Sequence, residues 1–242
     1  MSGVIALHGG GEYGPGDERA MDALVFAAVE AAGGASGGST ARIVVVPTAA
    51  ARQRPELAAS HGVAAFRDAA RRRGADADVQ VAWVLDPLGA DDETVIATLD
   101  AAHLVHFPGG DPDLIPALLR GTRAWDAVLR AYAAGACIAG ASAGAMALGE
   151  RLWTRDGGAD GLALVPRVAV LPHFGPGRLA SWRRDVEAGR SLAWVGIDER
   201  TVVVGHPGGR WRVAGAGRAH VIPPGADRPS ASAGDGETLS IP

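Results

Sequence analysis

A serine between two glycines is the first feature of the sequence that could do chemistry. Gly140-Ala141-Ser142-Ala143-Gly144 is a G-x-S-x-G motif between a strand pattern and a helix pattern. A tight strand-to-helix turn needs glycines two positions to either side of its central residue, because side chains there would clash. The hydroxyl of Ser142 would then be exposed at the edge of a sheet. The N–H of Ala143, at the start of the helix, could stabilise an oxyanion at the same point.

A nucleophilic serine needs a base, and the histidines supply the candidates. His173 ends a strand pattern that follows the serine in the chain and begins a loop, where its ring could reach Ser142. His206 and His220 are weaker candidates by the same criterion. The residues alone do not choose among the three.

The composition excludes several other kinds of chemistry. The chain has 242 residues, with 23 basic and 27 acidic residues and a formal net charge of -4. All the basic residues are Arg, so there is no lysine for a Schiff base or for a phosphate-binding loop. The single cysteine, Cys137, excludes an internal disulfide and a multi-cysteine metal site. We therefore expect no metal ion and no cofactor.

Charge and hydropathy also bear on partners and location. The sequence lacks the basic footprint that a nucleic-acid partner requires, and it has no apolar run long enough for a membrane helix. The first residues show no basic segment followed by an apolar stretch, so no secretory signal is predicted. We expect a soluble, cytoplasmic protein that binds neither nucleic acid nor membrane.

The elements that must position the serine alternate along the first part of the chain. Strands are predicted at residues 4–8, 42–46, 79–85, 102–107 and 136–141, and helices at 18–32, 55–73, 91–99 and 122–134. Apolar strands alternating with helices predict right-handed crossovers and a buried parallel sheet. The expected fold is therefore α/β: a single domain over residues 1–222, with a doubly wound, mostly parallel, flavodoxin-like sheet and helices on both faces.

Polar or glycine-rich turns follow four of these strands, at residues 8–12, 47–49, 108–111 and 141–143. Ligands bind at the carboxyl ends of strands in this architecture, so we expect the site at that edge.

The remaining part of the chain has shorter elements. Further strands are predicted at residues 168–171, 193–197, 201–204, 210–213 and 220–222, with a helix at 177–187. They would extend the sheet or form an antiparallel appendix. Residues 223–242 are mostly Pro, Gly, Ala, Ser and Asp, which predicts a disordered C-terminal tail.

Several motifs, taken in order, resemble a known family. They are Gly9-Gly10-Gly11-Glu12, Val45-Val46-Pro47-Thr48-Ala49, Phe107-Pro108-Gly109-Gly110-Asp111, the serine motif, Gly161-Leu162-Ala163-Leu164-Val165-Pro166 with His173-Phe174 and Arg178, and Gly196-Ile197-Asp198-Glu199. Over about residues 3–204 the chain resembles the dipeptidase E / cyanophycinase family of serine peptidases, which has the class I glutamine amidotransferase-like fold.

The resemblance implies catalytic roles for three residues. Ser142 would be the nucleophile, and His173 would be the general base that later protonates the leaving amine. Glu199 would be the acidic residue that orients the imidazole, with Asp198 as an alternate.

The resemblance also implies an oxyanion hole and substrate contacts. The N–H groups of Gly110 and Ala143 would hold the oxyanion, and Asp111 and Arg178 would bind substrate. Pro112 departs from the family, which commonly has a Gln there, so it puts substrate preference in doubt; it could instead begin a helix that Asp111 caps.

The implied activity is hydrolysis of small peptides, of aspartyl or β-aspartyl type, through an acyl-enzyme. The partner would be the peptide substrate, and a homodimer is the assembly left to test. Two alternatives stay open: an α/β-hydrolase-type esterase that uses His8-Gly9-Gly10-Gly11 as its oxyanion turn, and a catalytically inactive binding member of the fold. A glutamine amidotransferase would need a cysteine in the serine turn, whereas Cys137 is predicted to be buried on the strand.

Overall fold

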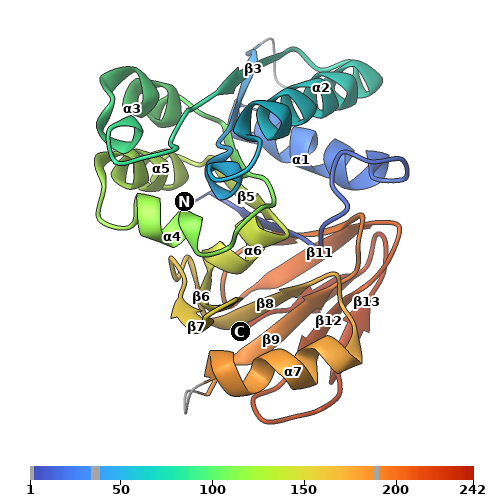
Figure 1. Ribbon diagram of the computed structural model, residues 1–242. Coiled ribbons are helices and arrows are strands. Elements are labelled where there is room, and N and C mark those ends of the chain that lie inside the picture. The colour runs from blue at the N-terminus through green and yellow to red at the C-terminus, as the bar shows by residue number, and fades with distance from the viewer. Residues whose placement is uncertain (1–2, 34–38, 188–190) are drawn as a thin grey trace.

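The structure is a computed structural model that describes residues 3–33, 39–187 and 191–242. Among these residues the strands form an eight-stranded sheet, in the order β14-β11-β10-β1-β5-β4-β2-β3, and a six-stranded sheet, in the order β13-β12-β9-β8-β6-β7. Figure 1 shows the first sheet and its helices in the upper half of the molecule and the second sheet below them. The predicted α/β class is confirmed.

The parallel part of the first sheet consists of strands from the first part of the chain. They are β1 (Ile5–His8), β2 (Ala41–Val45), β3 (Ala77–Val81), β4 (Leu104–Phe107) and β5 (Cys137–Ala141). β1 lies beside β5, and β5, β4, β2 and β3 follow in parallel register. The carboxyl ends of these strands therefore meet at one edge of the sheet.

Helices cover both faces of this sheet, as predicted. One face carries α1 (Glu18–Ala31) and α2 (Pro55–Arg73). The other face carries α3 (Glu93–Asp100), α4 (Leu114–Leu119), α5 (Arg123–Ala133) and α6 (Ala143–Leu148). Side chains alternate along a strand, so Ile5 and Leu7 of β1 pack in the core under α3–α6, whereas Ala6 packs in the core under α1 and α2.

Local signals explain where the helices begin and end. α2 begins with Pro55, whose missing N–H would have no partner in the first turn, and ends at Gly74 in the left-handed conformation with a φ of 62°. The Asp92 carboxylate accepts hydrogen bonds from Thr94 and Val95 at the start of α3.

Three antiparallel strands extend the first sheet beyond β1. They are β10 (Thr201–Gly205), β11 (Arg210–Gly215) and β14 (Thr238–Ser240). β10 brings the residues just before it, including Glu199, next to the carboxyl end of β1.

The second sheet contains the other six strands of the described residues. They are β6 (Gly149–Thr154), β7 (Gly157–Asp160), β8 (Val165–Pro172), β9 (Ala193–Ile197), β12 (Ala219–Ile222) and β13 (Ala231–Ala233). β8 is parallel to both β6 and β9, so this layer is mixed rather than antiparallel. The helix α7 (Pro176–Glu187) packs on it through Leu179 and Val186.

The prediction of a disordered tail over residues 223–242 is wrong. β13 pairs with β12 and β14 pairs with β11, so the last residues close one edge of each sheet. Ala233, Leu239 and Ile241 are buried in the main core. A few apolar side chains at the right spacing, with backbone pairing to distant strands, therefore order a segment that is mostly polar.

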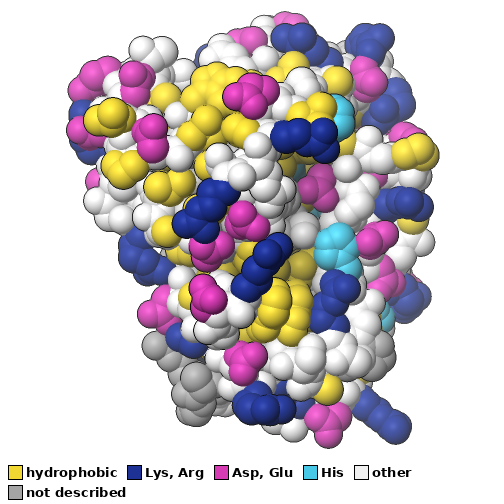
Figure 2. Space-filling model, in the orientation of Figure 1, with side chains coloured by type: hydrophobic (Ala, Val, Ile, Leu, Met, Phe, Trp, Pro, Cys, Tyr) yellow, Lys and Arg dark blue, Asp and Glu magenta, His cyan; other side chains and the backbone are white. Residues whose placement is uncertain are grey.

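No helix among the described residues is long and apolar enough to cross a lipid bilayer. On the face shown in Figure 2, arginine and acidic side chains are interspersed.

Candidate active site

Ser142 lies in the turn between β5 and α6, in a backbone conformation that non-glycine residues rarely adopt. Its φ is 49° and its ψ is -111°. A Cβ on Gly140 would lie 2.4 Å from the carbonyl carbon of Gly144, and a Cβ on Gly144 would lie 2.0 Å from the carbonyl oxygen of Phe107. Both positions therefore require glycine. The close packing that they permit holds the strained serine in place, as the G-x-S-x-G motif predicts.

The imidazole of His173 meets the hydroxyl of Ser142. Its Nε2 lies 3.0 Å from the serine Oγ. His173 directly follows β8, has a φ of 48° and donates its backbone N–H to the carbonyl of Gly9 at 2.7 Å. Its ring lies against Gly10, where a Cβ would be only 2.2 Å from the imidazole Cε1. The side chain is 31% exposed, so a substrate can reach it.

Glu199, in the turn between β9 and β10, completes the arrangement. Its Oε1 lies 2.7 Å from Nδ1 of His173. That hydrogen bond, with the charge of the imidazole, lowers the pKa of Glu199 below its usual range. The neighbouring Asp198 faces elsewhere: its Oδ2 accepts a hydrogen bond from the N–H of Arg218 at 2.9 Å. Of the two carboxylates considered from sequence, Glu199 is therefore the one in contact with the imidazole.

The three side chains form a continuous hydrogen-bonded chain from a hydroxyl to a carboxylate. Ser142 comes from the first sheet, whereas His173 and Glu199 follow strands of the second sheet, so the site lies where the two sheets meet. A hydroxyl at this distance from an imidazole can lose its proton to it, and a carboxylate on the far nitrogen stabilises the resulting charge. The geometry is that needed for nucleophilic catalysis.

The two backbone N–H groups expected to bind an oxyanion lie on turns beside the serine. Ala143 is the first residue of α6, where an N–H has no partner within the helix. Gly110 has a φ of 151° and packs so tightly on Ala49 that a Cβ would lie 2.2 Å from the Ala49 carbonyl oxygen. In the part of the chain that the structure describes, the N–H of Gly110 donates no hydrogen bond. Both groups can therefore donate to an oxyanion.

A carboxylate that sequence reasoning missed, that of Glu12, also lies beside Ser142. Its Oε1 accepts a hydrogen bond from the N–H of Gly109 at 2.9 Å. A Cβ on Gly109 would lie 2.7 Å from this oxygen and 3.3 Å from the Cβ of Ser142. Within the described ranges, no arginine or histidine forms an ion pair with Glu12. The sequence signal was its place in a turn at the end of a strand, but nothing local shows which way the side chain points.

The two residues expected to bind substrate are only partly at the site. Arg178, in the first turn of α7, donates from Nη1 to the carbonyl of Pro172 at 3.3 Å and lies over the ring of Trp182. Its charge makes a minor contribution to the lowered pKa of Glu199, so its guanidinium lies within electrostatic range of that carboxylate. Asp111 lies on the Gly110 turn, where its backbone N–H binds the Ala49 carbonyl.

The expectation that Pro112 begins a helix capped by Asp111 is wrong. α4 begins at Leu114, and Asp113 occupies the capping position without a side-chain hydrogen bond. The residues between Gly110 and α4 form a turn instead.

The other candidates lie away from the serine. His220 contacts Ser232 and Phe174 in the second sheet. Cys137 is fully buried, which raises the pKa of its thiol to about 12 and leaves it unsuited to act as a nucleophile. His206 lines a cavity on another part of the surface.

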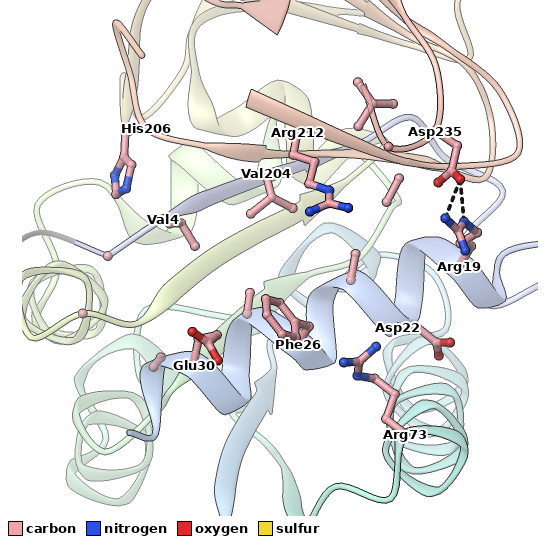
Figure 3. Close-up of a pocket in the computed structure, with 18 residues that line it drawn as sticks. Val4, Arg19, Asp22, Phe26, Glu30, Arg73, Val204, His206, Arg212 and Asp235 are labelled. Atoms are coloured by element: carbon pink, nitrogen blue, oxygen red, sulfur yellow. Dashed lines mark hydrogen bonds and ion pairs between the residues drawn. The ribbon is translucent and has the colours of Figure 1, made fainter. Parts of the chain in front are cut away.

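That cavity, of about 690 Å³, lies between α1 and the strands β10 and β11. Figure 3 shows Phe26 and Val204 on its walls, with Arg212 pointing into it and the Arg19–Asp235 ion pair at one end. None of the three residues of the hydrogen-bonded chain lines it. The chemistry of the side chains therefore favours the turn around Ser142 over this cavity as the candidate active site.

The contact of Gly10 with His173 yields a first prediction. Gly10→Ala should lower kcat by about 10²-fold, because the added methyl group must displace the imidazole and small misplacements carry costs of this size. Gly14→Ala in the same loop is the matched control, since its nearest atom would be an ordinary contact at 3.5 Å. Steady-state kinetics on both variants measure the difference. Equal activity in the two would mean that the position of the ring does not matter.

Comparison with known proteins agrees with this geometry. The model of peptidase family S51 matches residues 22–209, a range that contains Ser142, His173 and Glu199. A peptidase from an acI-B1 Actinobacterium, known from its crystal structure, is 27% identical with a TM-score of 0.76, and the alignment covers 100% of this chain and 98% of that one.

A Listeria monocytogenes EGD-e protein assigned as a candidate peptidase E shares the fold at 16% identity. Its TM-score is 0.53, and the alignment covers 92% of this chain and 99% of that one. No protein of curated function matches the chain. Because the family model spans most of the sequence, the chain belongs to peptidase family S51 and is a serine peptidase.

Proposed function

We propose that this peptidase cleaves small peptides of aspartyl or β-aspartyl type through an acyl-enzyme on Ser142, with His173 as the base. The observation that carries the proposal is the unbroken contact from the Ser142 Oγ through the imidazole to Glu199, at 3.0 Å and 2.7 Å. A serine peptidase of this kind needs no metal ion for its chemical step.

The reaction would follow the order of these contacts. His173 takes the proton of Ser142 as the oxygen attacks the peptide carbonyl. The N–H groups of Gly110 and Ala143 bind the oxyanion of the tetrahedral intermediate. The imidazolium then gives its proton to the leaving amine, and water, activated by the same ring, hydrolyses the ester.

Two charged side chains support a substrate that carries charges of both signs. The Arg178 guanidinium at the Glu199 end could receive the side-chain carboxylate of an aspartyl residue. The Glu12 carboxylate beside Ser142 could receive an ammonium group. A short peptide with a free amino group and an acidic side chain would engage both.

A panel of short peptides that differ in the side chain, the linkage or the free amino group of the first residue tests the substrate class. Asp-X and β-Asp-Arg peptides should be cleaved with a kcat/KM above that of Ala-X and of N-acetyl-Asp-X. Arg178→Gln should raise KM for the acidic substrates by about 10-fold, the worth of one exposed charge-assisted contact, and leave Ala-X cleavage nearly unchanged.

Arg184→Gln is the matched control, because Arg184 is an exposed arginine on the same helix. Equal cleavage of the acidic and neutral peptides by the wild-type protein would rule out the aspartyl assignment. A loss in Arg178→Gln that is the same for both substrates would exclude Arg178 from recognition.

A further inference from the structure

Three successive backbone carbonyls hold the three parts of the active site. They belong to residues 8–10, which run from the last residue of β1 into the glycine turn and are called here the 8–10 segment. The carbonyl of its first residue accepts the N–H of Ser142 at 3.0 Å, and the carbonyl of its second accepts that of His173 at 2.7 Å. The carbonyl of its third accepts the N–H of Arg200, the neighbour of Glu199, at 2.7 Å.

The three donors share an unusual conformation. Ser142, His173 and Arg200 all have a positive φ, of 49°, 48° and 56°. Such conformations are strained for residues with a side chain and persist only where surrounding contacts enforce them. Each of the three strained residues is bonded to the 8–10 segment, so the position of this segment sets where the nucleophile, the imidazole and the carboxylate stand relative to one another.

The 8–10 segment is itself fixed by the side chain of its first residue. Nδ1 of His8 accepts a hydrogen bond from the N–H of Gly10 at 3.0 Å, so this nitrogen carries no proton. The proton of the neutral ring is therefore on Nε2, which donates to Oδ1 of Asp17 at 2.7 Å. Both side chains are almost completely buried, at 1% and 2% exposed.

Asp17 connects the His8 side chain to the helix α1. It directly precedes α1, where the helix dipole stabilises a buried carboxylate. Its second oxygen, Oδ2, accepts a hydrogen bond from the N–H of Tyr13 at 3.0 Å. Burial and the nearby carboxylates of Glu12 and Asp17 raise the pKa of Tyr13, so its hydroxyl stays neutral.

We infer that His8 and Asp17 are positioning residues for catalysis, because they fix the peptide group between Gly9 and Gly10. The carbonyl of that peptide group binds the backbone of His173, and Gly10 lies against its ring. Neither side chain touches the reacting atoms, so they act only through the 8–10 segment. The inference rests on the proposed function, because it assigns these residues to the Ser142 mechanism.

Two amide variants separate this role from simple core stability. In His8→Asn the carbonyl of the side chain replaces Nδ1 and can still accept from Gly10, but the side chain is too short to reach Asp17. In His8→Gln the amide nitrogen replaces Nε2 and can still donate to Asp17, but nothing accepts from Gly10. If His8 positions the Gly10 N–H, the Asn variant should retain more activity than the Gln variant. If the His8–Asp17 contact only stabilises the fold, the Gln variant, which keeps that contact, should retain more activity.

The reaction of Ser142 with a fluorophosphonate measures the effect without a peptide substrate. At a temperature well below every Tm, the second-order rate constant should fall by about 10²-fold in His8→Gln and by less than about 10-fold in His8→Asn. Leu24→Ala is the matched control, because it removes a fully buried side chain of α1 from the same core and lowers Tm without changing the 8–10 segment.

A second readout needs no turnover. The proton that His173 Nδ1 shares with Glu199 should give a downfield proton NMR resonance, assigned by its absence in His173→Gln. This resonance should persist in His8→Asn and be lost or broadened in His8→Gln.

Reactivity of the wild-type protein tests the proposed function, and the ratios between variants test the positioning role. The inference is overturned if His8→Gln keeps both the labelling rate and the NMR resonance of the wild type. It is equally overturned if Leu24→Ala, at a matched loss of Tm, lowers the labelling rate as much as His8→Gln does.

Discussion

Ser142→Ala should lower kcat by about 10⁶-fold, the largest effect expected from any single substitution in this chain. The methyl group cannot be acylated, and the remaining activity would come only from the oxyanion N–H groups and substrate binding. The fold should survive, because alanine tolerates the same turn while Gly140 and Gly144 keep their contacts. The measurement is steady-state hydrolysis, together with labelling by a fluorophosphonate probe.

Ser60→Ala provides the matched control for this substitution. Ser60 is an exposed serine on α2 whose hydroxyl donates to the Leu57 carbonyl, one turn back on the same helix. The wild type and Ser60→Ala should each bind one equivalent of probe, and Ser142→Ala none. A folded wild-type protein that never takes up the probe would support the alternative of an inactive binding member of the fold. Labelling of Ser142→Ala would place the nucleophile elsewhere.

The parts of the site that the sequence predicts are those set by local structure. The turn around Ser142 is encoded by glycines within two residues of it, and the strand and helix on either side have their own periodicity. His173 is a candidate base because it follows a strand, but the residues alone do not choose it over His206 and His220. Its contact with the serine depends on β8 lying in a second sheet, and no spacing within the chain reports that.

What the sequence could not show depends on pairing between distant segments. The second sheet is built from short strands, and β13 and β14 have only three residues each. Their pairing with β12 and β11 joins residues that local periodicity does not relate. The same limit explains Glu12 and His8. Both lie in a glycine turn that the sequence indicates, yet only the folded chain shows the Glu12 carboxylate bonded to the N–H of Gly109, next to Ser142, and the His8 imidazole bonded to the buried Asp17.

Glu199→Gln should lower kcat by about 10³- to 10⁴-fold. The amide can donate to Nδ1 of His173, which favours the tautomer whose Nε2 carries a proton and cannot accept one from Ser142. The substitution also removes the negative charge that stabilises the imidazolium formed when Ser142 gives up its proton, so the loss should fall on kcat.

Asp198→Asn is the control that decides between the two neighbouring carboxylates. Asp198 bonds the N–H of Arg218 and lies 3.6 Å from His220, and an asparagine oxygen can keep the first of these contacts. Its kcat should therefore stay within about threefold of the wild type. The reverse outcome, a large loss in Asp198→Asn with Glu199→Gln nearly intact, would transfer the orienting role to Asp198. It would require the β9–β10 turn to be rearranged when substrate is bound.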